Sequence, residues 1–173
     1  MKVDDAYLIG LRLSPERGEP DQFTLWFEDA AGQNRVPRRD GRLQWAATPS
    51  AARRLADDEY DLAGAAAAAA EEVSVCSVPG LLYALTNPSD GDDRTVTLAL
   101  NLLDDLVNCT PTPLPPAAQR SLDMMVKTLT EGDDLRAGLG PAGSGAAVEA
   151  VFASLGRVLC FSDLNVGLTA APQ

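Results

Sequence analysis

Histidine is absent from this chain of 173 residues. The sequence therefore lacks the side chain that most often serves as a general base and as a metal ligand. It also lacks a GxSxG motif, which would mark a serine nucleophile. We expect a protein that is not an enzyme and that holds no metal and no cofactor.

Cysteine is scarce as well. Cys76, Cys109 and Cys160 are odd in number and lie 33 and 51 residues apart. They form no CxxC pair, so neither a zinc site nor a thioredoxin-like motif can be recognised. Each cysteine has apolar neighbours, and we expect buried or half-buried free thiols in a reducing compartment.

Aromatic residues make up only 5% of the chain, and long apolar runs are missing. The longest run, residues 63–70 interrupted by Gly64, is far shorter than the roughly 20 residues of a membrane-spanning helix. The N-terminus lacks the apolar segment of a signal peptide. We expect a cytoplasmic protein that does not contact membranes, with a core mainly of leucine, valine and alanine.

Charge is distributed unevenly along the chain. Residues 1–54 contain nine Lys/Arg and eight Asp/Glu, whereas residues 55–173 contain five and seventeen, so the net charges are +1 and −12. A field of this size and sign repels nucleic acid and anionic membranes and attracts basic partners. We predict a basic protein partner and no nucleic-acid binding.

Alternating apolar residues predict β-strands in the first third of the chain. Residues 7–13 and 23–28 alternate with a period of two, and Asp40–Gly41 is a strong hairpin signal. In the second segment, one face of the strand carries Phe23, Leu25 and Phe27, and the opposite face carries Thr24, Trp26 and Glu28. Residues 1–47 are expected to form an antiparallel meander of three or four strands.

From Thr48 onward the pattern becomes helical. Thr48–Pro49 is a typical N-cap followed by proline at the first helical position. We expect helices over residues 48–58, 61–72, 79–86, 92–108 and 116–130, and a last helix after a Gly-rich acidic loop at residues 131–145. Residues 73–78 are one more candidate strand.

The expected fold is a single α+β domain over residues 1–173. In it, the meander of residues 1–47 packs against a helical bundle within residues 48–165, and residues 166–173 form a frayed tail. The last helix has apolar residues at helical spacing, including Val148, Phe152, Leu155 and Leu159. We predict that Phe152 and Leu155 are core residues and that Ser144 caps this helix.

Five carboxylates in the acidic part are the candidate partner-binding residues. They are Asp104, Asp105, Glu131, Asp133 and Asp134. The first two lie near the C-terminal end of their helix, where the helix dipole disfavours an anion by roughly 0.3–1 kcal/mol. The other three lie on the predicted loop, and all five are expected to be exposed. For the first two, the alternatives are solvation or a salt bridge with an internal arginine such as Arg53 or Arg54.

Three other motifs have plainer interpretations. Residues 138–143 match GxGxxG, but an acidic turn rather than a strand precedes them, so they indicate a linker. Asp90, Asp92 and Asp93 lack the spacing of a calcium loop and suit a helix N-terminus. Four arginines around one hairpin are expected to make internal or intersubunit contacts with the acidic half; they are Arg35, Arg38, Arg39 and Arg42.

The order of several segments resembles a known class of proteins. YLIGLRLSP, QFTLWFEDAAG and DGRLQW are followed by LLYALTN and LNLLDDLVN, over about residues 4–108 and more loosely to 160. This order and composition resemble immunity proteins of bacterial polymorphic and contact-dependent toxin systems. The resemblance implies an acidic protein that binds a cognate toxin and blocks its active site. It has no signature motif and assigns no binding residue.

The sequence supports three hypotheses of function. The first is a non-enzymatic immunity or inhibitor protein that neutralises a basic partner through its acidic helical half. The second is a structural or assembly protein, either a secretion chaperone or a subunit of a homodimer or larger homo-oligomer. The third is a small-molecule binding module with a pocket between the sheet and the helices.

Overall fold

The computed structural model describes residues 2–69, 72–87, 93–131 and 135–159. At its centre is a four-stranded mixed sheet in the order β3-β2-β1-β6. The antiparallel part consists of β1 (Ala6–Arg12), β2 (Gln22–Glu28) and β3 (Asn34–Arg35). On the other side of β1, β6 (Val73–Ser77) runs parallel to it.

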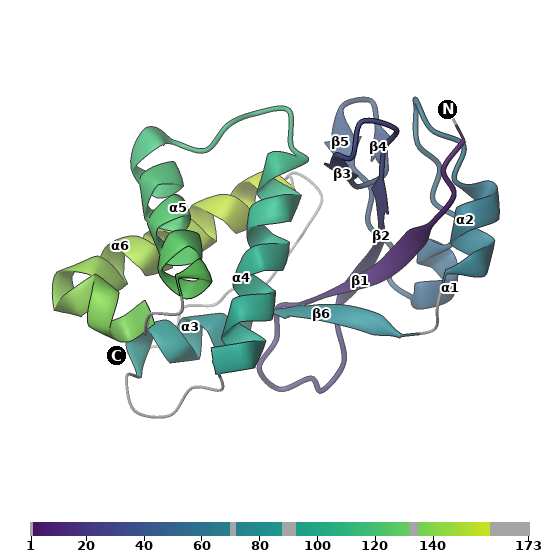
Figure 1. The fold of residues 1–173 in the computed structure, drawn as a ribbon. Helices are drawn as coiled ribbons and strands as arrows, with labels where there is room; N and C mark the ends of the chain where they lie inside the picture. The colour runs from purple at the N-terminus through teal and green to yellow at the C-terminus, as the bar shows by residue number, and fades with distance from the viewer. Residues whose placement is uncertain (1, 70–71, 88–92, 132–134, 160–173) are drawn as a thin grey trace.

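Helices cover both faces of this sheet (Figure 1). In the described residues they are α1 (Pro49–Ala52), α2 (Ala63–Ala68), α3 (Val78–Thr86), α4 (Asp93–Asn108), α5 (Pro116–Thr130) and α6 (Leu135–Val158). One face carries α1 and α2, and the other carries α3 and α4, with α5 and α6 packed behind them. No helix in this part of the chain has the length and apolar character that crossing a membrane requires.

The alternation of the strands creates two hydrophobic cores. On the face of α1 and α2, Leu8 and Phe27 are buried with the alanines of α2. On the opposite face, Ile9 and Leu11 are buried against α3, α4 and α6. Successive side chains of a strand point to opposite faces, so the central strands contribute to both cores. The predicted division of residues 23–28 between two faces is confirmed for Phe23, Leu25 and Phe27, which all lie in the first core.

The hairpin predicted at Asp40–Gly41 is present, but it forms a separate two-stranded sheet. Its strands are β4 (Arg38–Arg39) and β5 (Arg42–Leu43). Asp40 and Gly41 have φ angles of 52° and 74°, which is the left-handed backbone that tight hairpin turns require. The hairpin segment is tied to the main sheet by an isolated bridge between Phe23 and Ala46 and by a hydrogen bond that the Thr24 hydroxyl donates to the carbonyl of Gln44, 2.9 Å away.

The α+β class is confirmed, whereas the meander followed by a purely helical part is not. The strand predicted at residues 73–78 exists as β6, and it joins the sheet in parallel beside β1 after two helices have intervened. The sheet is therefore mixed, and the segment after residue 47 contributes an edge strand to it. The predicted tail at residues 166–173 lies outside the described residues.

The helix predicted over residues 48–58 is only four residues long. Thr48 caps it as expected, since its side chain accepts a hydrogen bond from the backbone N–H of Ala51. The chain then turns because Asp57 accepts backbone hydrogen bonds from Arg38, at 2.6 Å, and from Tyr60, at 3.0 Å. These bonds tie the segment to the hairpin and replace further helical turns.

The loop predicted at residues 131–145 is wrong from residue 135 on, because α6 begins at Leu135, and residues 132–134 lie outside the described residues. The GxGxxG segment and Ser144 therefore lie within a helix of 24 residues, and Ser144 is not its N-cap. Glycine destabilises an isolated helix by roughly 1 kcal/mol per residue. Here α6 packs along α5, and such tertiary packing supplies most of a helix's stability in a folded protein.

The buried face of α6 also differs from the predicted one. Leu155 is buried as expected, with 4% of its surface exposed, but Phe152 is 48% exposed. Three of the six residues on the inward stripe are alanine or serine; the stripe consists of Ala147, Ala150, Val151, Ser154, Leu155 and Val158. Small side chains on this stripe let α5 and α6 pack against each other. Phe152 lies outside the stripe and is largely exposed, so the prediction that it is a core residue is wrong.

Candidate functional site

A cleft lies between the sheet and α4. Its volume is about 380 Å³, which is near the lower end for a ligand pocket. Its lining includes the start of β1 and the end of β2, where Tyr7 and Glu28 are exposed. The lining residues are Tyr7, Ile9, Trp26, Glu28, Asn34, Ser74, Leu98, Asn101 and Leu102.

The floor of the cleft is an aromatic pair. Tyr7 of β1 lies directly opposite Trp26 of β2 in the antiparallel register, so their side chains are neighbours on the same face of the sheet. Tyr7 is 61% exposed and Trp26 is half-buried. Large aromatic side chains this accessible present a flat apolar surface to a ligand.

The wall of the cleft is one stripe of α4. Leu98, Asn101 and Leu102 line the cleft, and Asp105 follows on the same stripe because its spacing continues the helical repeat. The Oδ1 atom of Asp105 accepts a hydrogen bond from the side-chain amide of Asn34, 3.2 Å away. The thiol of Cys109 donates to the backbone carbonyl of Asn34 at 3.3 Å. These contacts hold β3 against the C-terminal part of α4 beside the cleft, which Asn34 lines.

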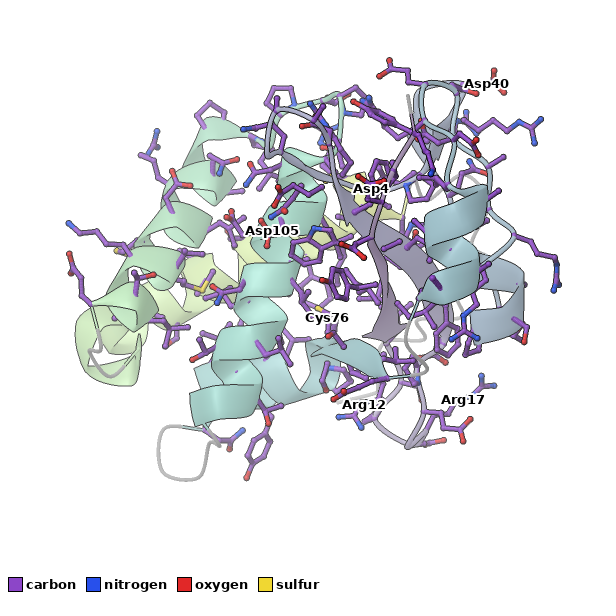
Figure 2. The ribbon with its side chains drawn as sticks, turned by 45° about the vertical axis from the view of Figure 1, so that its right-hand side comes forward. Asp4, Arg12, Arg17, Asp40, Cys76 and Asp105 are labelled. Carbon is purple, nitrogen blue, oxygen red and sulfur yellow. The ribbon has the colours of Figure 1, made fainter. Side chains whose placement is uncertain are left out.

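The charged side chain that lines the cleft in the described residues is negative. Among the described residues that line it, Glu28 is the one charged side chain, and it is exposed and forms no ion pair with a described residue. Asp105 adds a second carboxylate beside the lining residue Asn34. Figure 2 shows Asp105 on α4 and Cys76 of β6, whose thiol donates to the carbonyl of Ala99 on the same helix. The cleft therefore combines an aromatic floor with acidic groups and disfavours an anionic ligand.

Asp104 and Asp105 are half-buried, so the prediction that they are exposed is wrong. Burial raises the pKa of both carboxyls, and the charges of Asp105 and Asp123 raise the pKa of Asp104 further. The Asp104 carboxylate accepts a hydrogen bond from the Asn108 amide at 3.2 Å. No described arginine contributes to the pKa of either carboxyl, and Asp105 is likewise paired with an amide, that of Asn34. An amide stabilises the ionised carboxylates less than an arginine would.

We predict that Asp104→Asn stabilises the fold at neutral pH. A carboxyl whose pKa is raised on folding favours the folded state below its ordinary pKa and opposes it once the pH exceeds the raised value. Removing the charge should therefore increase the free energy of unfolding by about 0.3–1 kcal/mol at neutral pH. The increase should vanish near about pH 3, where aspartate is protonated. Urea denaturation at the two pH values measures it.

Asp29→Asn provides a matched control with the opposite sign. Backbone N–H groups of Gln33 and the guanidinium of Arg35 hold the pKa of Asp29 below its ordinary value. Its ionised form therefore stabilises the folded state above the ordinary pKa, and this stabilisation is lost as the pH falls through the lowered value. A loss of stability at neutral pH in Asp104→Asn, in the same direction as in Asp29→Asn, would contradict the description of Asp104.

The other three candidate carboxylates are not shown to join this group. Glu131 is the exposed C-cap residue of α5 and lies 3.7 Å from the ammonium of Lys127. Asp104 and Asp105 lie near the C-terminal end of α4, which leads into the N-terminal end of α5. Glu131 follows the opposite, C-terminal end of α5 (Figure 1). Asp133 and Asp134 lie outside the described residues. The structure instead adds Asp123 of α5, which acts on Asp104.

Two of the four arginines around the hairpin, Arg35 and Arg38, make internal ion pairs. Arg35 pairs with Asp29 at 2.8 Å, within the turn that joins β2 to β3. Arg38 lies 3.9 Å from Glu59, so one contact reaches into the second, acidic part of the chain as predicted. A second cavity, of about 400 Å³, lies between this hairpin and the end of α6. Its charged residues are of both signs, namely Asp40, Arg42 and Arg157, so it shows no preference for one charge.

Two of the three cysteines are buried free thiols, as predicted. Burial raises the pKa of Cys76 to about 12 and that of Cys109 to about 11. The thiolate is the reactive form, so both residues should react with iodoacetamide at pH 8 far more slowly in the native protein than in urea. Peptide mass spectrometry measures this, and equal rates in the two conditions would contradict the burial. Cys160 lies outside the described residues.

Sequence reasoning did not find the floor of the cleft. The alternation did place Trp26 and Glu28 on the face opposite the buried phenylalanines, and an aromatic residue on an otherwise polar strand face was the available signal. Three or more potential metal ligands do not cluster anywhere in the described residues. Comparisons with protein-family models, curated proteins and solved structures gave no significant match to this chain.

Proposed function

We propose that this protein is a non-enzymatic binding protein that recognises and blocks a basic partner protein. The observation that carries the proposal is the cleft between the sheet and α4, where an accessible aromatic floor meets Glu28 and Asp105. Aromatic residues at the centre of a contact with charged groups around them are typical of protein interfaces. The negative sign of those groups selects a basic surface.

Asp104 and Asp123 extend the negative surface beyond the cleft. Burial disfavours the ionised form of Asp104, and the charges of Asp105 and of Asp123 on α5 disfavour it further. A basic partner would relieve that repulsion. Proteins commonly keep destabilising groups of this kind where function requires them. The surface that we propose for partner binding therefore consists of the cleft, Asp104, Asp105 and Asp123.

The kind of partner follows from the resemblance to immunity proteins. We propose a toxin domain with a basic surface, which the protein inhibits by covering its active site. We also propose a cytoplasmic location, because the two described cysteines are free thiols, the state that a reducing compartment maintains.

A second candidate function is binding of a small molecule. The cleft has a volume of about 380 Å³ and is mainly apolar with a few polar groups, which fits the general form of small-molecule sites. The two candidates differ in what they require of the surface outside the cleft. Only a protein partner would contact Asp104 and Asp123.

Capture of partners from the native host tests the proposal. The bait proteins are the wild type, Asp104→Asn/Asp105→Asn, and the control Glu16→Gln/Glu149→Gln, which removes two charges from exposed positions elsewhere. We expect a basic protein that binds the wild type and the control and is depleted with the aspartate variant. Its activity should fall on adding one equivalent of the wild type. Equal capture by all three baits, or an acidic captured protein, would overturn the proposal.

A further inference from the structure

We infer that the cleft takes an arginine side chain of the partner, with the guanidinium plane against Tyr7 and Trp26 and its charge toward Glu28. This inference rests on the proposed function and specifies what the partner inserts. Its basis is the size, the chemistry and the charge of the cleft, and each of these restricts the kinds of group that can bind there.

The charge of the cleft excludes an anion and favours a cation. Glu28 is exposed, lines the cleft and has no ion-pair partner among the described residues. Asp105 lies beside the cleft, hydrogen-bonded to the lining residue Asn34, and no lysine or arginine occurs among the lining residues that the structure describes. An incoming cation would therefore meet Glu28 in the cleft and Asp105 beside it, while the nearby Arg35 is paired with Asp29.

The aromatic floor favours arginine over lysine. A guanidinium is planar, is weakly hydrated and stacks on aromatic faces, whereas an ammonium is a compact and strongly hydrated charge. Tyr7 and Trp26 form the directly opposed pair that such a plane can cover. Acceptors for the five N–H donors of arginine are available on Glu28, Asn101 and Ser74.

The size and position of the cleft favour a side chain presented by a protein. About 380 Å³ holds one or two side chains but not a helix or a strand with its neighbours. Leu98 lines the cleft and is 44% exposed. An apolar residue of the partner, next to the inserted arginine, would cover Leu98. Outside the rim, Asp104 and Asp123 continue the acidic surface. A protein that inserts one arginine here would place its basic surroundings over those carboxylates.

The two tryptophans provide an internal control for a direct test. The indole of Trp26 lines the cleft, whereas the indole N–H of Trp45 donates to the carbonyl of Val158, 3.1 Å away, and does not line it. The probe is the peptide acetyl-Gly-Arg-Gly-amide, titrated into protein labelled with ¹⁵N at the indole nitrogens. We expect a saturable shift of the Trp26 signal and a constant Trp45 signal.

Two comparisons establish the role of the charge. The citrulline peptide has nearly the same shape without the charge and should bind about tenfold more weakly. Glu28→Gln should weaken the arginine peptide about threefold, whereas Glu149→Gln, at an exposed position of α6, should leave it unchanged. Tyr7→Ala, at a largely exposed position, should also weaken binding without loss of the fold.

The outcomes separate this inference from the function on which it rests. A Trp26 signal that stays constant, or that responds equally to arginine and citrulline, overturns the arginine assignment. If capture of a basic partner still depends on Asp104 and Asp105 in that case, the proposed function stands and only the cleft's occupant is wrong. If the peptide binds as expected but capture is equal for all baits, the proposed partner surface fails.

Discussion

Leu155→Ala is expected to lower the free energy of unfolding by about 2–5 kcal/mol, whereas Phe152→Ala on the same helix should change it by only about 0.5 kcal/mol. Leu155 is 4% exposed within the core that α3, α4, α5 and α6 share. Truncating it leaves a cavity that the packed helices fill only in part. Phe152 is 48% exposed and gives up little buried surface.

This pair tests the orientation of α6 directly, because the sequence pattern alone assigns both residues to the core. Urea denaturation followed by circular dichroism measures both variants under the same conditions. A large loss for Phe152→Ala together with a small loss for Leu155→Ala would mean that α6 is rotated about its axis relative to the structure described above.

Phe27→Ala should lower the free energy of unfolding by about 3–5 kcal/mol. Phe27 is completely buried on the face of α1 and α2, and its ring meets that of Tyr60 edge-to-face with centroids 5.2 Å apart. The variant loses both the buried apolar surface and the ring contact. Because α1 and α2 are short, the stability of this layer depends on the few large side chains beneath it.

Phe27→Leu is the control, since it keeps most of the volume and should lose less than about 1.5 kcal/mol. The same denaturation experiment distinguishes the two variants. Equal and small losses in both would show that the layer formed by α1 and α2 does not enclose Phe27.

The local features of this fold follow from short-range patterns. The strands at residues 7–13 and 23–28, the Asp40–Gly41 turn and the Thr48 cap were all predictable, because each depends on residues within a few positions of one another. The position of β6 was not, because its parallel pairing with β1 is set by packing across more than sixty residues of chain. The start of α6 depends in the same way on contact with α5.

In the candidate site, too, the features that depend on local sequence could be predicted, and those that depend on distant contacts could not. Asp104 and Asp105 were identified from their position near a helix end, which is local information. The opposition of Tyr7 and Trp26 depends on the β1–β2 register, and Asn34 meets Asp105 across 71 residues of sequence. Burial of the two aspartates could not be predicted. It depends on how β3, which is distant in the chain, and α5, which follows after a linker, pack beside α4.

The association rate constant of the captured partner, measured by stopped flow at ionic strengths of about 0.05 M and about 0.5 M, tests the central claim most directly. Steering by the acidic surface predicts a wild-type rate that falls roughly tenfold with added salt, and a slower, less salt-dependent rate for Asp104→Asn/Asp105→Asn. Glu16→Gln/Glu149→Gln, with the same change in net charge, should behave nearly as the wild type. A wild-type rate that does not change with salt, or equal rates for the two double variants, would contradict the claim that this surface binds a basic partner.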